Sequence, residues 1–442
     1  MPLIGRLIER KREGKSLTRT EWGSLISDYT SGAIPEYQMA ALLMASFLNG
    51  LSSEELSALT DAMIESGEKL AFEEGFVAID KHSIGGVGDK VSIVLAPLVA
   101  CCGVPVPMMS GRGLGHTTGT LDKLEAIPGF RTRLTLNEAR KQVEAIGCAM
   151  FGQTEEIAPA DRKLYALRDA TATVESIPLI AASIMSKKLC EGIAGLVLDT
   201  KHGSGAFLPG QEQAMELARV MIELGEDRGC RTVALLTAMD RPLGKACGNA
   251  LETCEAIEAL SGGGPEDLIE VTIALGVEML ILGRVCKTPD EARELLVRSL
   301  ADGSALEKLS EIVSAQGGDA RAVENPSLLP KAQHVRDFES PSVGFVARIE
   351  PREIGHAIVA MGGGRSKVDD SIDYGAGFVF NVAPGAEVDE GEVLASVHAS
   401  SEESIELGLQ ALKNSILISE SPPAPLSPLV SHRADASGVA SL

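Results

Sequence analysis

The sequence predicts an α/β protein: an all-α domain, a large α/β domain with a mainly parallel central sheet, and a β-rich C-terminal segment. Three observations favour this class. Residues 1–67 have helical periodicity, two later strand-like runs each lead into a glycine-rich loop, and short strands with turns dominate after residue 343. With 442 residues and 45 % hydrophobic content, the chain is long enough for two or three domains.

The first 67 residues predict a group of helices. Thr18 with Glu21 and Ser52 with Glu55 have the spacing of capping boxes, in which a Ser or Thr is followed three residues later by Glu. Pro35 begins another helix between these two, and its run AALLMASFL is apolar on every side. We expect that run to be buried by a partner helix or by another subunit.

Two strands with glycine-rich loops follow. The run FVAID, residues 76–80, is typical of a strand and leads into DKHSIGGVGDK, and the strand VPVPMMS ends at Ser110 and leads into GRGLGHTTGT. In a parallel sheet, ligands collect at the carboxyl ends of the strands, so both loops can reach one ligand. Free backbone N–H groups, the Ser83 hydroxyl and the start of a helix near Val91 favour an anion there.

The rest of the chain alternates between helices and strands. Helical patterns return over residues 161–192, LVLDTKHGSGAF and TVALLTAMDRPLG predict strands with loops, and a closing helix is expected near 402–415. The last residues, rich in Pro and Ser, predict a loosely held tail. The expected domain boundaries are 1–67 and 161–194 for the two parts of the all-α domain, 74–158 and 195–340 for the two parts of the α/β domain, 341–420 for the C-terminal subdomain and 421–442 for the tail.

Composition excludes several partners. A formal net charge of -22 and an aromatic content of 3 % argue against nucleic acid, which requires a basic face and stacking platforms. No apolar stretch is long enough for a signal peptide or a membrane span, so a cytoplasmic protein is expected. Eight cysteines without a C-x-x-C pair speak against zinc and against a disulfide framework.

A further group of polar residues lies on the predicted helices of residues 161–192. Arg168 precedes a helix on which Ser183 and Lys187 are spaced i, i+4 and share one face. Taken singly, Arg168 or Lys187 is most often a solvated helix residue. Together with the hydroxyls of Ser110 and Thr120 in the second loop, these residues predict a binding site for an anionic ligand.

Four motifs lie along the chain: DKHSIGGVGD, SGRGLGHTTGTLDKLE, LYALRDATATVESIPLIAASIMSKK and KHGSGAF. In these motifs the chain resembles the thymidine and pyrimidine-nucleoside phosphorylase family, and the resemblance is in register over nearly the whole chain. The resemblance implies a homodimer formed through the all-α domain, which faces the α/β domain across a cleft. It also implies reversible phosphorolysis of a pyrimidine nucleoside to free base and pentose 1-phosphate, with inorganic phosphate as co-substrate and no cofactor.

The resemblance assigns roles by position. Phosphate would be held by Lys81, Ser83, Ser110 and Thr120, and the pyrimidine by Tyr165, Arg168, Ser183 and Lys187. His82, Arg168 and Lys187 would be catalytic, because they can stabilise the charge that grows on the base as the bond to the sugar breaks. Apolar contacts to the substrate are expected from Leu114, Val174, Ile180 and Phe207.

Three positions depart from the family pattern. Ile84 stands where many relatives have threonine and Thr118 where glycine is usual. Bacterial relatives bind potassium near the first loop. The positions that match its ligands here are Gly88, Lys90, Leu243, Ala246 and Glu255, and Lys90 stands where those relatives have a threonine ligand. The Lys90 ammonium, paired with Glu255, is therefore expected to occupy the place of the ion.

Three other functions are alternatives to a pyrimidine-nucleoside phosphorylase. A phosphoribosyltransferase of the anthranilate type resembles the family in fold but would need magnesium held by acidic residues, and no acidic pair stands in these loops. A phosphorylase of nucleoside monophosphates is associated with an extra N-terminal domain. A non-catalytic anion-binding regulator on the same fold would have no need for His82, Arg168, Ser183 and Lys187 together.

Overall fold

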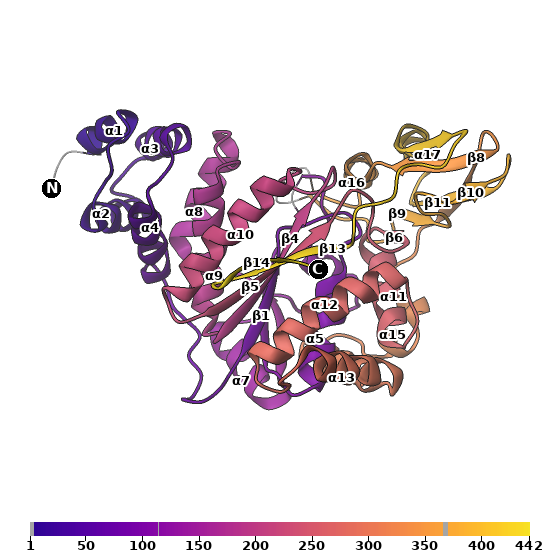
Figure 1. The fold of residues 1–442 in the computed structure, drawn as a ribbon, viewed down its shortest axis with the longest axis horizontal. Helices are drawn as coiled ribbons and strands as arrows, with labels where there is room; N and C mark the ends of the chain where they lie inside the picture. Colours follow the sequence, from indigo (N-terminus) through magenta and orange to yellow (C-terminus); the bar gives the residue numbers. More distant parts are fainter. Residues whose placement is uncertain (1–3, 114, 366–369) are drawn as a thin grey trace.

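The computed structural model describes residues 4–113, 115–365 and 370–442 (Figure 1). It confirms the predicted class: a group of helices stands beside a central sheet covered by further helices, and a β-rich subdomain lies at the far end. No helix in the described part of the chain is long and apolar enough to span a membrane.

The all-α part combines two distant stretches of chain. Helices α1 (Ile4–Arg12), α2 (Arg19–Thr30), α3 (Glu36–Asn49) and α4 (Ser53–Glu65) pack with α8 (Pro159–Ala170) and α9 (Ile177–Lys188). Both predicted capping boxes are present, with the side chains of Thr18 and Ser52 accepting from the backbone N–H groups of Glu21 and Glu55. Apolar side chains from all six helices enter one shared core.

The central sheet has the order β1-β4-β5-β13-β14, and the first three strands are parallel. These are β1 (Ile79–Ser83), β4 (Gly195–His202) and β5 (Arg231–Ala238); β1 thus begins three residues later than the predicted run of 76–80. Alternate residues of β4 and β5 face opposite sides, so Val197 packs against α5 (Val91–Cys101) and α12 (Glu266–Leu282), while Leu198 packs toward α10 (Gln211–Glu226) and the all-α helices.

A short parallel pair stands beside this sheet. Strand β2 (Val106–Ser110) pairs with β3 (Cys148–Gly152), and the Ile79 amide donates to the Pro105 carbonyl at 2.9 Å. Strands β1 and β2 therefore end side by side, as the two glycine loops require. The other helices of the α/β domain are α6 (Thr120–Leu124), α7 (Leu136–Ile146), α11 (Asn249–Leu260), α13 (Pro289–Ala301), α14 (Ser304–Ala315) and α15 (Arg321–Glu324), with short 3-10 turns at Leu189–Glu191 and Pro326–Leu328.

The C-terminal subdomain contains two small antiparallel sheets. One has the order β6-β9-β11-β7, with β6 (Ala246–Cys247), β7 (His334–Glu339), β9 (Gly377–Phe380) and β11 (Val393–Ala399); the other has the order β10-β8-β12, with β8 (Gly344–Ile349), β10 (Glu387–Val388) and β12 (Ile416–Ser419). Helices α16 (Pro351–Ala360) and α17 (Glu402–Ser415) pack on them. Strand β7 lies before the expected boundary at residue 341, although it pairs with β11 of this subdomain. The two strands are about sixty residues apart in sequence, so no local pattern links them.

The expectation of a loosely held tail over residues 421–442 is wrong for most of that segment. Strand β13 (Val430–Asp435) pairs antiparallel with β5 and β14 (Gly438–Ser441) continues the central sheet, as the yellow hairpin across the middle of Figure 1 shows. Arg433 also pairs with Glu278 of α12 at 2.7 Å. Proline and serine dominate only the stretch before β13, so composition alone concealed the strands.

Candidate active site

A cleft with a cavity volume of about 260 Å³ lies between helices α8 and α9 on one side and the two glycine loops on the other. Ten of the predicted site residues line it: His82, Ser83, Thr120, Tyr165, Arg168, Val174, Ile180, Ser183, Lys187 and Phe207. Lys81 and Ser110 do not line this cavity, and Leu114 lies outside the described residues. The fold thus brings together residues that are more than one hundred positions apart.

On the helical wall, Lys187 is held by two neighbours. Its Nζ lies 2.5 Å from the Asp161 Oδ2 of α8 and donates to the Ser183 Oγ one turn earlier at 3.0 Å. Asp161 is buried and Lys187 is half-buried at the cleft. Because an ammonium group has three N–H donors, one remains for a ligand, and the Ser183 hydroxyl proton is also available.

Arg168 is buried and holds the turn between α8 and α9. Its three nitrogens donate to the carbonyls of Thr173 at 3.2 Å, Leu179 at 2.9 Å and Val174 at 2.7 Å. Two of the roughly five guanidinium N–H donors are left for a ligand. The guanidinium also lies 5.9 Å from the ring centre of Tyr165, and burial lowers the pKa of Arg168 from its ordinary value.

His82 stands at the end of β1, between the helical wall and the first loop. Burial lowers the pKa of His82 well below its ordinary value, and the cations Lys188, Lys187 and Lys81 lower it further. The imidazole is therefore neutral at pH 7, and it can donate a hydrogen bond but does not arrive as an imidazolium.

The loop wall is built on a buried network of charges. Ser83 Oγ donates to Asp89 Oδ2 at 2.6 Å and accepts from the Gly85 amide at 3.2 Å. Lys81 lies 3.1 Å from Asp199 and 3.4 Å from the Ser92 hydroxyl. The predicted phosphate ligands Lys81 and Ser83 thus already have protein partners.

Asp89 is the carboxylate at the centre of this network. Burial would raise the pKa of Asp89, but Lys201, Lys81 and Lys123 outweigh burial and hold it well below the usual range. Lys201 lies 3.0 Å from Asp199 and 3.7 Å from Asp89. Asp89 therefore stays ionised beside the cleft, and its charge is compensated by lysines from two strands.

Lys90 fills a buried site behind the first loop. Its Nζ donates to the carbonyls of Leu243 and Ala246, both at 2.8 Å, and lies 2.5 Å from Glu255 Oε2. Burial alone would lower the pKa of Lys90, but Glu255 and Glu252 outweigh it and raise the pKa. Gly88 has φ +73° and a Cβ there would lie 2.4 Å from the Leu243 carbonyl oxygen, so only glycine fits this approach.

The second loop is tied to two other parts of the chain. Arg112 pairs with Glu125 at 2.7 Å and with Asp122 at 3.0 Å, and Asp122 also accepts from the Gly113 amide at 2.7 Å. The Thr118 hydroxyl donates to Glu252 Oε1 of α11 at 3.0 Å. The unusual threonine therefore has a defined partner, and Ile84, a second departure from the family pattern, lines the cleft.

Sequence reasoning missed several residues of the site. Asp161, Asp89, Asp199 and Lys201 hold the predicted ligands, and Ile184, Leu208 and Leu217 add to the lining. Asp161 stands three residues before the motif LYALRD, and Lys201 begins the motif KHGSGAF, so the position next to or within a motif was the available signal.

Among the described residues, no group of three or more His, Cys, Asp or Glu side chains is arranged to hold a metal ion.

Family comparisons cover most of the chain. Residues 76–306 match the glycosyl transferase family, a/b domain, residues 6–67 match the helical bundle domain of the glycosyl transferase family, and residues 345–419 match the pyrimidine nucleoside phosphorylase C-terminal domain. The first match alone spans about half of the chain.

Individual relatives agree with these matches. The chain is 45 % identical to the pyrimidine-nucleoside phosphorylase of Staphylococcus epidermidis over 95 % of this chain and 97 % of that protein. It is 46 % identical to that of Geobacillus stearothermophilus, over 94 % and 96 %, and 47 % identical to that of Bacillus subtilis, over 90 % and 92 %.

A solved structure shows likeness of fold. The anthranilate phosphoribosyltransferase of Thermus thermophilus superposes with a TM-score of 0.57, covering 70 % of this chain and 98 % of that one. At 18 % identity, this likeness speaks for the architecture alone.

Proposed function

The chain belongs to the pyrimidine-nucleoside phosphorylase family, and we propose that its cleft holds a pyrimidine nucleoside and inorganic phosphate for reversible phosphorolysis to free base and pentose 1-phosphate. As a member of that family the protein is a pentosyltransferase. The observation that carries the assignment of the site is the meeting of Arg168, Ser183 and Lys187 on one wall with two glycine loops on the other.

In this reaction a phosphate oxygen forms a bond to C1′ of the sugar, the bond from C1′ to N1 of the base breaks, and its electron pair goes to the pyrimidine. Lys187 and Arg168 donate hydrogen bonds to the base from the helical wall, where they stabilise charge that grows only in the transition state. Asp161 holds Lys187 in place, and the carbonyls of the α8–α9 turn hold Arg168. Neutral His82 donates to a base carbonyl from the loop side.

Phosphate binds at the loops on this proposal. Thr120 at the start of α6 and Ser110 supply hydroxyls, Ser83 takes part by exchanging its hydrogen bond to Asp89 for one to the anion, and Lys81 supplies charge from β1. Lys81 already forms an ion pair with Asp199, and the Asp89 carboxylate lies nearby. Backbone N–H groups of the loops therefore make many of the hydrogen bonds to phosphate. No cofactor takes part in this scheme.

Lys90 serves as an internal cation in place of a potassium ion. Its three contacts, two carbonyls and the Glu255 carboxylate, are oxygen ligands of the kind that a monovalent cation accepts. The ammonium group stabilises the first loop against the segment around Leu243 without exchange with the medium. Activity is therefore expected to be equal in sodium and potassium buffers.

The protein forms a homodimer through its all-α part. Tyr37, Met44 and Leu48 lie on one face of α3 and are exposed, with Tyr37 at 74 % and Leu48 at 72 %, whereas the apolar side chains of Met39, Leu42 and Leu43 on the same helix are buried. A second copy of the same face covers such side chains in a two-fold dimer. Light scattering should give twice the chain mass, and Leu48→Glu should shift the mass toward one chain.

The role in the cell is nucleoside salvage in the cytoplasm. Phosphorolysis releases a base that can be reused and a phosphorylated sugar that enters carbon metabolism.

The decisive experiment incubates the protein with thymidine, deoxyuridine or uridine, with and without phosphate, and follows the free base by its absorbance. Base release is expected only with phosphate and to persist in EDTA. Full activity in phosphate-free buffer, or its loss on adding EDTA, would contradict the proposal.

A further inference from the structure

A second cavity, of about 710 Å³, lies beside the cleft and contains none of the residues assigned to the base. We call it the outer cavity; it is lined by Ser110, Gly111, Arg112, Leu121, Thr132, Arg133, Leu134, Thr135, Glu138, Gly152, Gln153, Thr154, Glu155, Glu156 and Arg162. Gly111 and Arg112 line both cavities, whereas Ser110 lines only the outer one. The outer cavity therefore adjoins the second glycine loop at residues 110–112.

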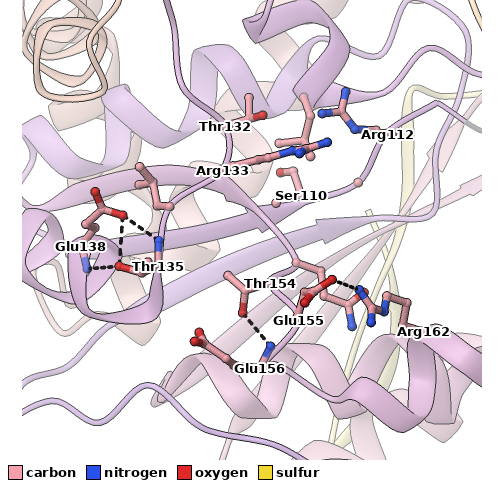
Figure 2. Close-up of a pocket in the computed structure, with 15 residues that line it drawn as sticks. Ser110, Arg112, Thr132, Arg133, Thr135, Glu138, Thr154, Glu155, Glu156 and Arg162 are labelled. Carbon is pink, nitrogen blue, oxygen red and sulfur yellow. Dashed lines mark hydrogen bonds and ion pairs between the residues drawn. The ribbon is translucent and has the colours of Figure 1, made fainter. Parts of the chain in front are cut away.

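Charges are unevenly distributed in the outer cavity. Figure 2 shows Ser110, Arg112, Thr132 and Arg133 gathered at one end, away from two groups that contain the acidic side chains, Glu138 with Thr135 and Glu155 and Glu156 with Arg162. Glu138 is engaged by the Thr135 amide at 2.8 Å and Glu155 by Arg162 at 3.0 Å. The end next to Ser110 is thus its basic end.

Arg133 differs from the other two arginines of this cavity. Arg112 is paired with Glu125 and Asp122, and Arg162 with Glu155. Arg133 has no hydrogen bond or ion pair to any residue of the described ranges, and Figure 2 draws its side chain extending toward Arg112 above Ser110. Its guanidinium donors are free beside a hydroxyl already proposed as a phosphate ligand.

A free guanidinium matters at this place because the chain carries a formal net charge of -22. Such a molecule repels a phosphate dianion at long range, so a local positive field is needed to bring the anion in. A guanidinium offers paired donors that match phosphate oxygens. Arg133 lines the outer cavity and not the 260 Å³ cleft, so it would remain open to the anion when a nucleoside occupies the cleft.

We propose that the outer cavity is a second, recruiting site for a phosphate dianion, in which Arg133 binds the anion before it passes over Ser110 to the loops. The inference rests on the proposed phosphorolysis. The ligand is inorganic phosphate or the phosphate group of pentose 1-phosphate, which share the chemistry that Arg133 recognises.

The test compares Arg133→Gln, Arg133→Glu and Arg133→Lys with Arg131→Gln. Arg131 is an exposed arginine two residues away that pairs with Glu138 at 3.4 Å and does not line the outer cavity, so it controls for net charge. KM for phosphate and for nucleoside is measured in phosphorolysis, and KM for pentose 1-phosphate in the reverse reaction. Each is measured at about 0.05 M and about 0.5 M salt, since the Debye length falls severalfold between them.

Arg133→Gln should raise KM for phosphate about threefold and Arg133→Glu about tenfold, as expected for one exposed charge acting on a dianion. KM for the nucleoside should stay the same in all variants. Arg133→Lys should have a KM for phosphate close to that of the unaltered protein, and at high salt the phosphate KM values of all variants should become equal. A parallel rise in KM for pentose 1-phosphate extends the site to that ligand, and a rise for phosphate alone restricts it to the free anion.

An unchanged phosphate KM in Arg133→Glu, or an equal change in Arg131→Gln, would overturn the inference. Absence of phosphorolysis in the unaltered protein would instead refute the proposed function, so the two failures are distinguishable.

Discussion

The two walls of the cleft hold their cations in different ways. On the helical wall, Arg168 is held by backbone carbonyls and Lys187 by one carboxylate and one hydroxyl. On the loop wall, Lys81, Lys90, Lys123 and Lys201 are all buried and each pairs with a buried carboxylate. The helical wall keeps donors free for a ligand, whereas the loop wall uses its charges to hold itself together.

On the proposed function, the difference follows from the groups that each wall would bind. A neutral pyrimidine gains negative charge only during reaction, so free donors aimed at it act where they are most needed. Phosphate is charged from the start, and flexible glycine loops need fixed anchors before their N–H groups can converge on it. Lysine in the loop motifs is thus first a structural residue, and ligand binding there depends on the shape that the ion pairs maintain.

The largest effect that would sharpen this comparison is expected from Lys187→Met. Loss of a donor to the developing charge should lower kcat/KM for the nucleoside by about a thousandfold, while the phosphate KM changes little. Steady-state kinetics in both substrates measure this.

A matched variant separates catalysis from stability at the same position. Lys187→Met leaves the buried Asp161 carboxylate without its cation, so it should also destabilise the fold. Adding Asp161→Asn should recover stability in urea but not activity. Recovery of activity in the double variant would mean that Lys187 is only a structural partner.

The sequence predicted residue types and positions better than it predicted partners. Helices α2, α3 and α4 and the closing helix α17 followed from local caps and periodicity, and ten site residues line the cleft as expected. The partners of the loop lysines are distant: Asp199 and Glu255 lie more than one hundred residues from Lys81 and Lys90. Such pairs depend on how the sheet brings segments together, and a local pattern contains no sign of them.

The hairpin β13–β14 gives the same lesson for the fold. Strand β13 pairs with β5, almost two hundred residues earlier, and β14 pairs with β13. Most side chains of the hairpin are partly or fully exposed, so the alternation that marks a half-buried strand is weak. Pairing to an existing sheet edge supplied the stability that the local sequence does not indicate.

The second prediction tests the structural role of the loop lysines. Lys90→Met should destabilise the protein by about 3 kcal/mol, because the buried Glu255 carboxylate loses its counter-charge. Urea unfolding measures the loss. Lys90→Thr should be less harmful in potassium than in sodium, if an ion can take the place of the ammonium group. Equal stability of Lys90→Thr in both salts, or a potassium requirement in the unaltered enzyme, would contradict the internal-cation role.

The third prediction concerns His82, which lies between the walls. Since its pKa is lowered on folding, the unfolded chain binds a proton first as pH falls below the ordinary value of 6.5. The contribution of His82 to stability is therefore fully present above pH 6.5 and decreases as pH falls from there toward the folded pKa. The free energy of unfolding of His82→Gln should lack this part of its pH dependence. Because His82 stays neutral in the folded protein, the ratio of kcat in the unaltered protein to kcat in His82→Gln should stay constant from pH 8 to about pH 6.

NMR titration of the histidine ring signals, with His82→Gln to assign the resonance, gives the folded pKa directly. A His82 ring that titrates clearly above pH 7 would show that it is an imidazolium at neutral pH, and the neutral-donor role would have to be abandoned.

The smallest effect is expected at Thr118, where the two glycine loops and α11 meet. Thr118→Val keeps the volume of the side chain but removes the hydrogen bond to Glu252, which also pairs with buried Lys123 at 2.8 Å. The loss of one hydrogen bond to a charged group is worth about 1 kcal/mol at this half-buried position, or about fivefold in an equilibrium. If the bond serves to order the second loop, kcat/KM for phosphate should fall by about that factor while the nucleoside KM stays constant. Thr118→Ser, which retains the hydroxyl, should behave like the unaltered protein; equal loss in both variants would point to the methyl group, and no loss in either would show that the loop needs no anchor there.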